Sequence, residues 1–131
     1  MRPAAAAVAL GMLAGCASTT YDASLAATTP KTEVPTTLPS GPPEVILPRM
    51  LAEAQSLSPL ILDRGDDGAV MTQIDEDWRA VQNEVRATHP ELVPAFEDAV
   101  RTLTAASKLN RAADADKAAK NLQVLIEHYL A

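Results

Sequence analysis

The sequence contains a single cysteine, at position 16, so no disulfide can form within the chain. Neither histidine, His89 or His128, stands in a spacing used by zinc, di-iron or covalent haem motifs. No serine lies in the Gly-x-Ser-x-Gly pattern of hydrolase nucleophiles. Acidic residues outnumber basic ones by 17 to 11, which excludes a strongly basic surface for nucleic acid. The sequence therefore predicts no enzymatic activity, no cofactor, no resident metal and no nucleic-acid partner.

An uncharged, alanine-rich run separates Arg2 from the only cysteine and ends in Leu13-Ala14-Gly15-Cys16. A basic residue, a short apolar run and small residues before a cleavage point are typical of a secretory signal. The apolar run has about 14 residues, fewer than the roughly 20 that a membrane-spanning helix needs. The alternatives are an uncleaved anchor and an ordinary secretory signal, but an unpaired cysteine in an exported protein calls for a function of its own.

The tetrapeptide Leu13-Ala14-Gly15-Cys16 resembles the lipobox of bacterial lipoproteins, in which two small residues separate an aliphatic residue from a cysteine. The resemblance implies that residues 1–15 are a signal peptide and that Cys16 carries a diacylglycerol. It further implies a protein held outside the cytoplasm by its lipid. Ala17 after the cysteine resembles the default for sorting to the outer membrane, where a cell has two membranes. Since the chain is acidic, attachment to a membrane would depend on the acyl chains.

Residues 16–47 are rich in serine, threonine and proline and contain few large apolar side chains. Such a segment has too little apolar surface to offset its chain entropy. We therefore expect a disordered linker with a polyproline II bias between the lipid and the domain that follows. A glycosylated Ser/Thr/Pro stalk is the alternative.

Residues 48–131 repeat apolar side chains at steps of three and four, which predicts amphipathic helices and no strand. Pro48 suits the first turn of the first helix, and Pro59 predicts a kink or a restart within it. Asp66 or Asp67 is expected to cap the second helix, which ends at His89-Pro90. The third helix begins at Glu91 or Pro94, and the fourth follows Asn110 or Asp114. The expected apolar stripes are Ile46, Leu47, Met50, Leu51, Ala54, Leu57, Ile61 and Leu62; Val70, Met71, Ile74, Trp78, Val81 and Val85; Leu92, Phe96, Val100 and Leu103; Ala118, Leu122, Leu125, Ile126 and Tyr129.

Short connections between these segments predict an all-α fold, a small antiparallel bundle of three to four helices. The acidic run Asp75-Glu76-Asp77 is expected on the solvated face of the second helix, because successive side chains point about 100° apart. The stretch 63–68 is expected to be a capping turn. A calcium loop beginning at Asp63 would lack oxygen ligands at Gly65 and Ile74.

Two functions remain open for the bundle. The preferred one is a non-enzymatic structural or partner-binding module at the cell envelope. The alternative is a periplasmic haem- or metal-binding carrier, since Met50 and His128 are similar in position to the haem ligands of b-type four-helix cytochromes. That resemblance implies an axial methionine in the first helix and an axial histidine near the end of the last.

Overall fold

The computed structural model describes residues 37–131, and these fold into helices without a strand. The predicted all-α class is therefore confirmed for this part of the chain. The signal peptide, Cys16 and residues 17–36 of the expected linker lie outside the described residues. The elements are α1 (Pro43–Asp63), α2 (Asp67–Thr88), the short 3-10 helix η2 (Pro90–Leu92), α3 (Val93–Lys108) and α4 (Ala112–Leu130).

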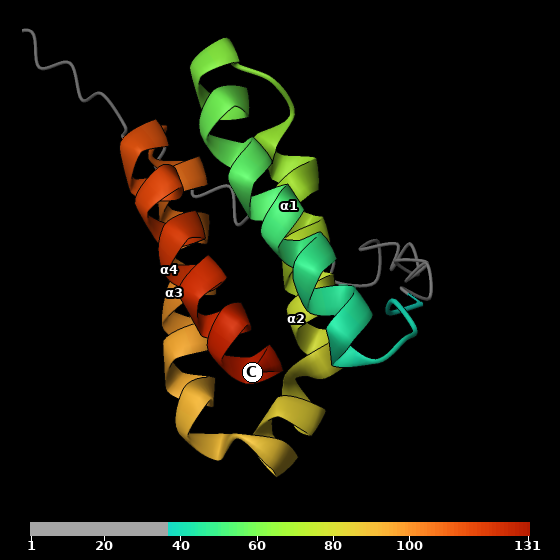
Figure 1. Cartoon of the computed structure of the whole chain (residues 1–131). Helices are drawn as coiled ribbons and strands as arrows, with labels where there is room; N and C mark the ends of the chain where they lie inside the picture. Colours follow the sequence, from blue (N-terminus) through green and yellow to red (C-terminus); the bar gives the residue numbers. More distant parts are fainter. Residues whose placement is uncertain (1–36) are drawn as a thin grey trace, which may run out of the picture. The chain divides into compact units, whose positions relative to one another are not determined.

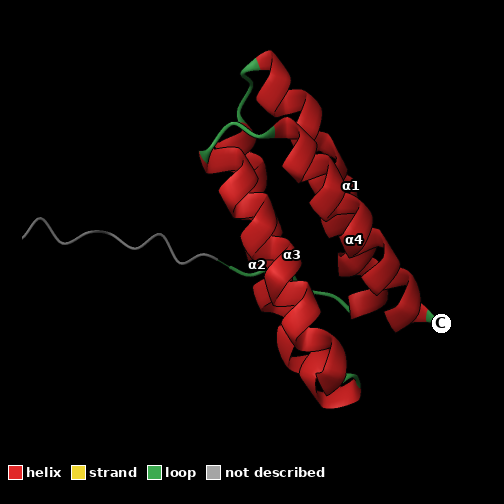
Figure 2. Ribbon diagram, turned by 90° about the vertical axis from the view of Figure 1, so that its left-hand side faces the viewer, coloured by secondary structure: helices red, strands yellow, loops and turns green. Residues whose placement is uncertain are grey.

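The four α-helices form an antiparallel bundle in which each helix runs opposite to its sequence neighbours (Figure 1). α1 packs against α2 and α4, and α3 packs against the same two helices. Residues 64–66 connect α1 to α2, and residues 109–111 connect α3 to α4. Figure 2 shows that all regular structure drawn for the described residues is helical. Short connections of this kind keep successive helices adjacent, as the sequence predicts.

None of the helices in the described part of the chain combines the length and the apolar character that crossing a bilayer requires.

The first helix begins earlier than the sequence indicates. We expected the boundary between linker and bundle at 47/48, but α1 begins at Pro43, so residues 43–47 belong to the bundle. The carbonyl of Pro42 accepts the amides of Val45 and Ile46 at 3.0 and 3.2 Å, which closes the first turn. Proline is suited to the start of a helix because the first amides have no partner within it. Pro43 fills this role, and Pro48 is the sixth residue of the helix.

The sequence predicts a kink or a restart at Pro59, and the structure excludes the restart, because α1 continues through this residue. An interior proline removes one hydrogen bond and strains one turn. Pro59 is exposed, whereas Leu57 and Ile61 on either side of it are buried in the core. Packing of these two side chains holds the helix together across the missing bond.

The turn between α1 and α2 is a capping structure, as expected. Arg64 has left-handed backbone geometry, with φ of 55°, and the Gly65 amide donates to the Leu60 carbonyl at 2.8 Å. A Cβ at Gly65 would lie 2.8 Å from the Leu60 side chain, which explains the glycine. The Asp66 carboxylate then accepts the Ala69 amide at 3.0 Å and caps α2.

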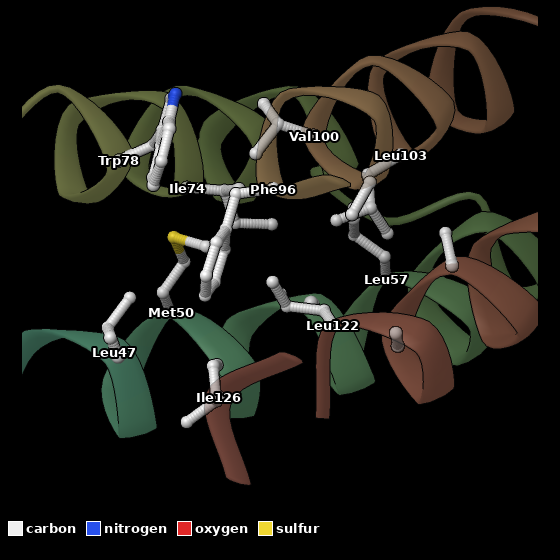
Figure 3. Packing of buried hydrophobic residues seen from close by; sticks show 14 of the residues in the cluster. Leu47, Met50, Leu57, Ile74, Trp78, Phe96, Val100, Leu103, Leu122 and Ile126 are labelled. Atoms are coloured by element: carbon white, nitrogen blue, oxygen red, sulfur yellow. The ribbon is translucent and has the colours of Figure 1, made fainter. Parts of the chain in front are cut away.

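The core is built from the apolar stripes of all four helices (Figure 3). Trp78 is 5% exposed, which confirms its predicted burial, and its ring stacks on Phe96 of α3. The two ring centroids are 5.2 Å apart, and the planes meet at 13°. Figure 3 shows Met50 of α1 directed toward these rings, with Leu122 and Ile126 of α4 nearby.

The prediction of burial is wrong for one residue of the expected stripe of α1. Leu62 continues the apolar stripe of α1 in the sequence, but its side chain is 71% exposed, whereas Leu57 is fully buried. Leu62 directly follows Ile61 and therefore points about 100° away from it around the helix axis. At the end of α1, the bundle covers the Ile61 side of the helix and leaves the Leu62 side open.

These two leucines test the bundle with the same substitution at two sites of one helix. Leu57→Ala should lower the free energy of unfolding by about 2–5 kcal/mol, because it removes buried methyl groups and leaves a cavity. Leu62→Ala should change it by less than about 0.5 kcal/mol, as surface substitutions do. Thermal unfolding followed by circular dichroism measures both. Equal losses would contradict the phase of α1 in the bundle.

Candidate functional site

The most unusual group in the bundle is the carboxylate of Asp77 on α2. Among residues 37–131, Asp77 is the one charged side chain that is fully buried. Both of its oxygens are bound by Arg49 of α1: the guanidinium Nε donates to Oδ2 at 3.0 Å, and Nη2 donates to Oδ1. The side chain of Arg49 is 45% exposed, so its guanidinium is partly hydrated while it binds the buried carboxylate. This bidentate ion pair joins α1 to α2.

Glu53 lies one turn after Arg49 on α1 and completes an acidic cluster with Asp77. Its Oε2 atom is shielded from solvent and has no hydrogen-bond partner among the described residues. Burial, followed by the negative charge of Asp77, raises the pKa of Glu53 to about 7, and Arg49 acts in the opposite direction. Near neutral pH, Glu53 therefore exchanges a proton, whereas an exposed glutamate would be ionised.

The structure corrects the prediction for Asp77. The sequence places Asp75, Glu76 and Asp77 together on a solvated face, and Asp75 is indeed exposed, with Arg79 at 4.0 Å. Glu76 is half-buried, and Asp77 is wholly enclosed. α1 covers the side of α2 that carries Asp77 and supplies Arg49 there, so burial comes with a matched positive charge.

Arg49 and Glu53 were missed in the sequence as members of a site. Their spacing of four residues, beside the buried Met50 and Ala54, is a signal that places both at the edge of the core face of α1. The identity of their partner depends on the neighbouring helix, which no local spacing reveals.

The structure does not bring Met50 and His128 together. Both lie toward the same end of the bundle, near the start of α1 and the end of α4. Met50 is fully buried in the apolar core, and His128 is exposed. An axial pair would have to face one shared cavity. The two side chains instead lie in different surroundings, one among hydrocarbon and one in solvent.

A second polar group lies at the corner where α2 passes into α3. The His89 Nδ1 atom is 3.2 Å from the Glu91 carboxylate, and the His89 ring meets Tyr129 edge-on with centroids 5.1 Å apart. A backbone hydrogen bond, followed by the bond from His89, lowers the pKa of Glu91. Residues 37–131 contain no group of three or more acidic, histidine or cysteine side chains arranged to hold a metal ion. These contacts hold the corner against the end of α4.

A shallow groove of about 340 Å³ runs between α3 and α4. Its walls are low because three alanines line it, and Val124 at its edge is 64% exposed. The lining residues are Ala95, Asp98, Ala99, Thr102, Ala118, Asn121, Val124 and Leu125. Met50 and His128 do not belong to this groove.

The site that the geometry singles out is thus the cluster of Arg49, Glu53 and Asp77 between α1 and α2. Comparison with protein-family models, with curated proteins and with solved structures finds no match for this chain. The chemistry of the cluster follows from its own groups. One guanidinium neutralises one buried carboxylate, and a second carboxyl group holds a proton near neutral pH.

Removing Arg49 should be far more costly than removing an arginine from an exposed pair. Arg49→Ala leaves Asp77 buried without a counter-charge, and breaking a buried ion pair in this way costs about 3–5 kcal/mol, less where the acid takes up a proton. The control is Arg101→Ala, which ends an exposed pair with Asp98 on α3. Its cost should stay below about 1 kcal/mol. Chemical unfolding followed by Trp78 fluorescence measures both, and similar losses would show that Asp77 is not dependent on Arg49.

Proposed function

We propose that this chain is a bacterial lipoprotein that presents a small helical bundle at the cell envelope. The observation that carries the proposal is the single cysteine at position 16, directly after Leu13-Ala14-Gly15 and a short apolar run. Lipidation gives this lone thiol a function that a disulfide within the chain cannot. Residues 1–15 are the signal peptide, and the membrane is the first partner of the mature chain. Ala17 favours the outer membrane in a cell that has two.

The anchor in this proposal is the lipid itself. The chain carries a net charge of −6, so anionic headgroups repel it, and removal of the signal peptide with Arg2 makes the balance more acidic. Each buried CH₂ of an acyl chain contributes about 0.8 kcal/mol, and two chains are enough for stable attachment. Residues 16–42 then act as the linker, which shortens the expected segment because α1 begins at Pro43.

The bundle is proposed to act as a structural or partner-binding module without enzymatic activity. Its interior is filled by apolar side chains from all four helices, which suits a rigid support. The buried acid Asp77 has both oxygens bound by Arg49 and is therefore not free to act on a substrate. The partner is an envelope component, and no nucleic acid is involved.

Replacing the lipid acceptor tests the proposal. Cys16→Ser should abolish incorporation of a labelled fatty acid and leave the precursor uncut, because the thiol is the atom that carries the diacylglycerol. In detergent phase separation, the wild-type protein should enter the detergent-rich phase. The Cys16→Ser variant should carry no label. Ala17→Ser is the matched control, since it introduces a serine one residue later and leaves the thiol in place.

Labelling that persists in Cys16→Ser, or a wild-type chain that takes up no fatty acid, would refute the lipoprotein proposal.

A further inference from the structure

The cluster between α1 and α2 contains two carboxyl groups and one guanidinium. Arg49 places two of its N–H donors on Asp77, one on each oxygen, and so pairs its single positive charge with this carboxylate. Glu53 is left beside this pair with a shielded oxygen that accepts no hydrogen bond from the described residues. A charge on Glu53 would therefore be a second negative charge facing one positive group. This imbalance is built into the contact that joins the two helices.

We propose that the cluster is a proton-operated latch between α1 and α2. With a proton on Glu53, the cluster consists of one ion pair and one neutral acid, and the two helices remain tightly packed. Loss of that proton leaves two carboxylates on one guanidinium and loosens the contact. The proton goes to solvent past the partly exposed side chain of Arg49, and no covalent bond other than O–H changes.

The surroundings of Glu53 leave few groups to compensate its charge. From its own helix Arg49 attracts the ionised form, and from α2 Asp77 repels it. The residues that α3 and α4 bury in the bundle are apolar. Burial itself also disfavours the charged form, since a carboxylate removed from water loses its hydration. Repulsion and burial act in the same direction, and only Arg49, already committed to Asp77, acts against them.

The sign of the pH effect follows from these surroundings. The pKa of Glu53 is raised from 4.5 to about 7 in the folded chain, so between these values the folded state holds a proton that the unfolded state has released. The stabilisation is complete below the ordinary pKa and is lost as the pH rises through about 7. For one such group the unfolding equilibrium constant rises by at most about tenfold per pH unit within this range.

The latch is placed where loosening affects the core. Glu53 lies on α1 between Met50 and Leu57, both fully buried, and Asp77 directly precedes Trp78 on α2. A shift of either helix at this level would disturb the core around the stacked rings, toward which Met50 is directed (Figure 3). The inference depends only on these contacts and is independent of the lipid anchor.

The test compares full-length wild-type protein with Glu53→Gln, which reproduces the shape and neutrality of the protonated acid. Unfolding temperatures are measured by Trp78 fluorescence at pH 5, 6, 7 and 8 in a mild non-ionic detergent. The two unfolding temperatures should be closest at pH 5, and Glu53→Gln should be the more stable by on the order of 10–20 °C at pH 8. The control, Glu84→Gln on the exposed side of α2, should differ from wild type by the same amount at every pH.

Two further measurements separate a local latch from a general effect on stability. The side-chain carboxyl carbon of Glu53 in wild-type protein should titrate near pH 7 in an NMR experiment, which does not require any variant to fold. Asp77→Asn should move that titration to lower pH, because it removes the repelling charge. In hydrogen exchange, amides of α1 and α2 should lose more protection between pH 6 and 8, relative to Glu53→Gln, than those of α3.

A Glu53 carboxyl that titrates near 4.5 would overturn the proposal. So would a temperature difference between wild type and Glu53→Gln that is the same at pH 5 and pH 8. Loss of protection spread equally over all four helices would also refute a latch confined to α1 and α2.

Discussion

The fold depends on the shared burial of one apolar core by four short amphipathic helices. A domain of this size buries a smaller fraction of its surface than a large one, so each helix is stable only against its neighbours. The stacked rings of Trp78 and Phe96 join α2 to α3, and Met50 brings α1 to the same place. With one tryptophan and one phenylalanine in the chain, this contact has no duplicate elsewhere. The rest of the core is aliphatic and rich in alanine, which brings the helices close together.

Against this background, a charged cluster at a helix contact is costly. Burying Asp77 removes its hydration, and the fork of Arg49 replaces the lost hydrogen bonds while its own charge stays partly in water. A leucine at the position of Glu53 would avoid the problem of a second acid. The bundle instead holds a group whose charge changes within the neutral range, and it places this group in the contact that closes α1 on α2. Stability is thereby coupled to proton concentration at one defined point.

Local rules predicted much of the fold. The spacing of apolar residues predicts the helices and the burial of Trp78, and Asp66, which caps α2, is one of the two candidates that the sequence offers. The errors arose where a neighbouring helix overrides a local preference. Pro59 would interrupt an isolated helix, but the burial of Leu57 and Ile61 keeps α1 continuous. The sequence does not reveal that α1 begins at Pro43, because prolines are as typical of a linker as of the start of a helix.

The sequence by itself determined the helical class and the identity of the residue proposed to carry the lipid, and it narrowed the cap of α2 to Asp66 or Asp67, because each follows from side chains within a few positions of one another. It could not choose between Asp75 and Asp77. At 100° per residue, the two acids lie on opposite sides of the centre of the stripe formed by Val70, Met71, Ile74, Trp78, Val81 and Val85, Asp75 about 90° and Asp77 about 70° from it. The hydrophobic pattern of α2 is therefore nearly symmetrical with respect to them. Only the tertiary structure decided which is buried, since α1 lies on the side of Asp77 and brings Arg49 to it.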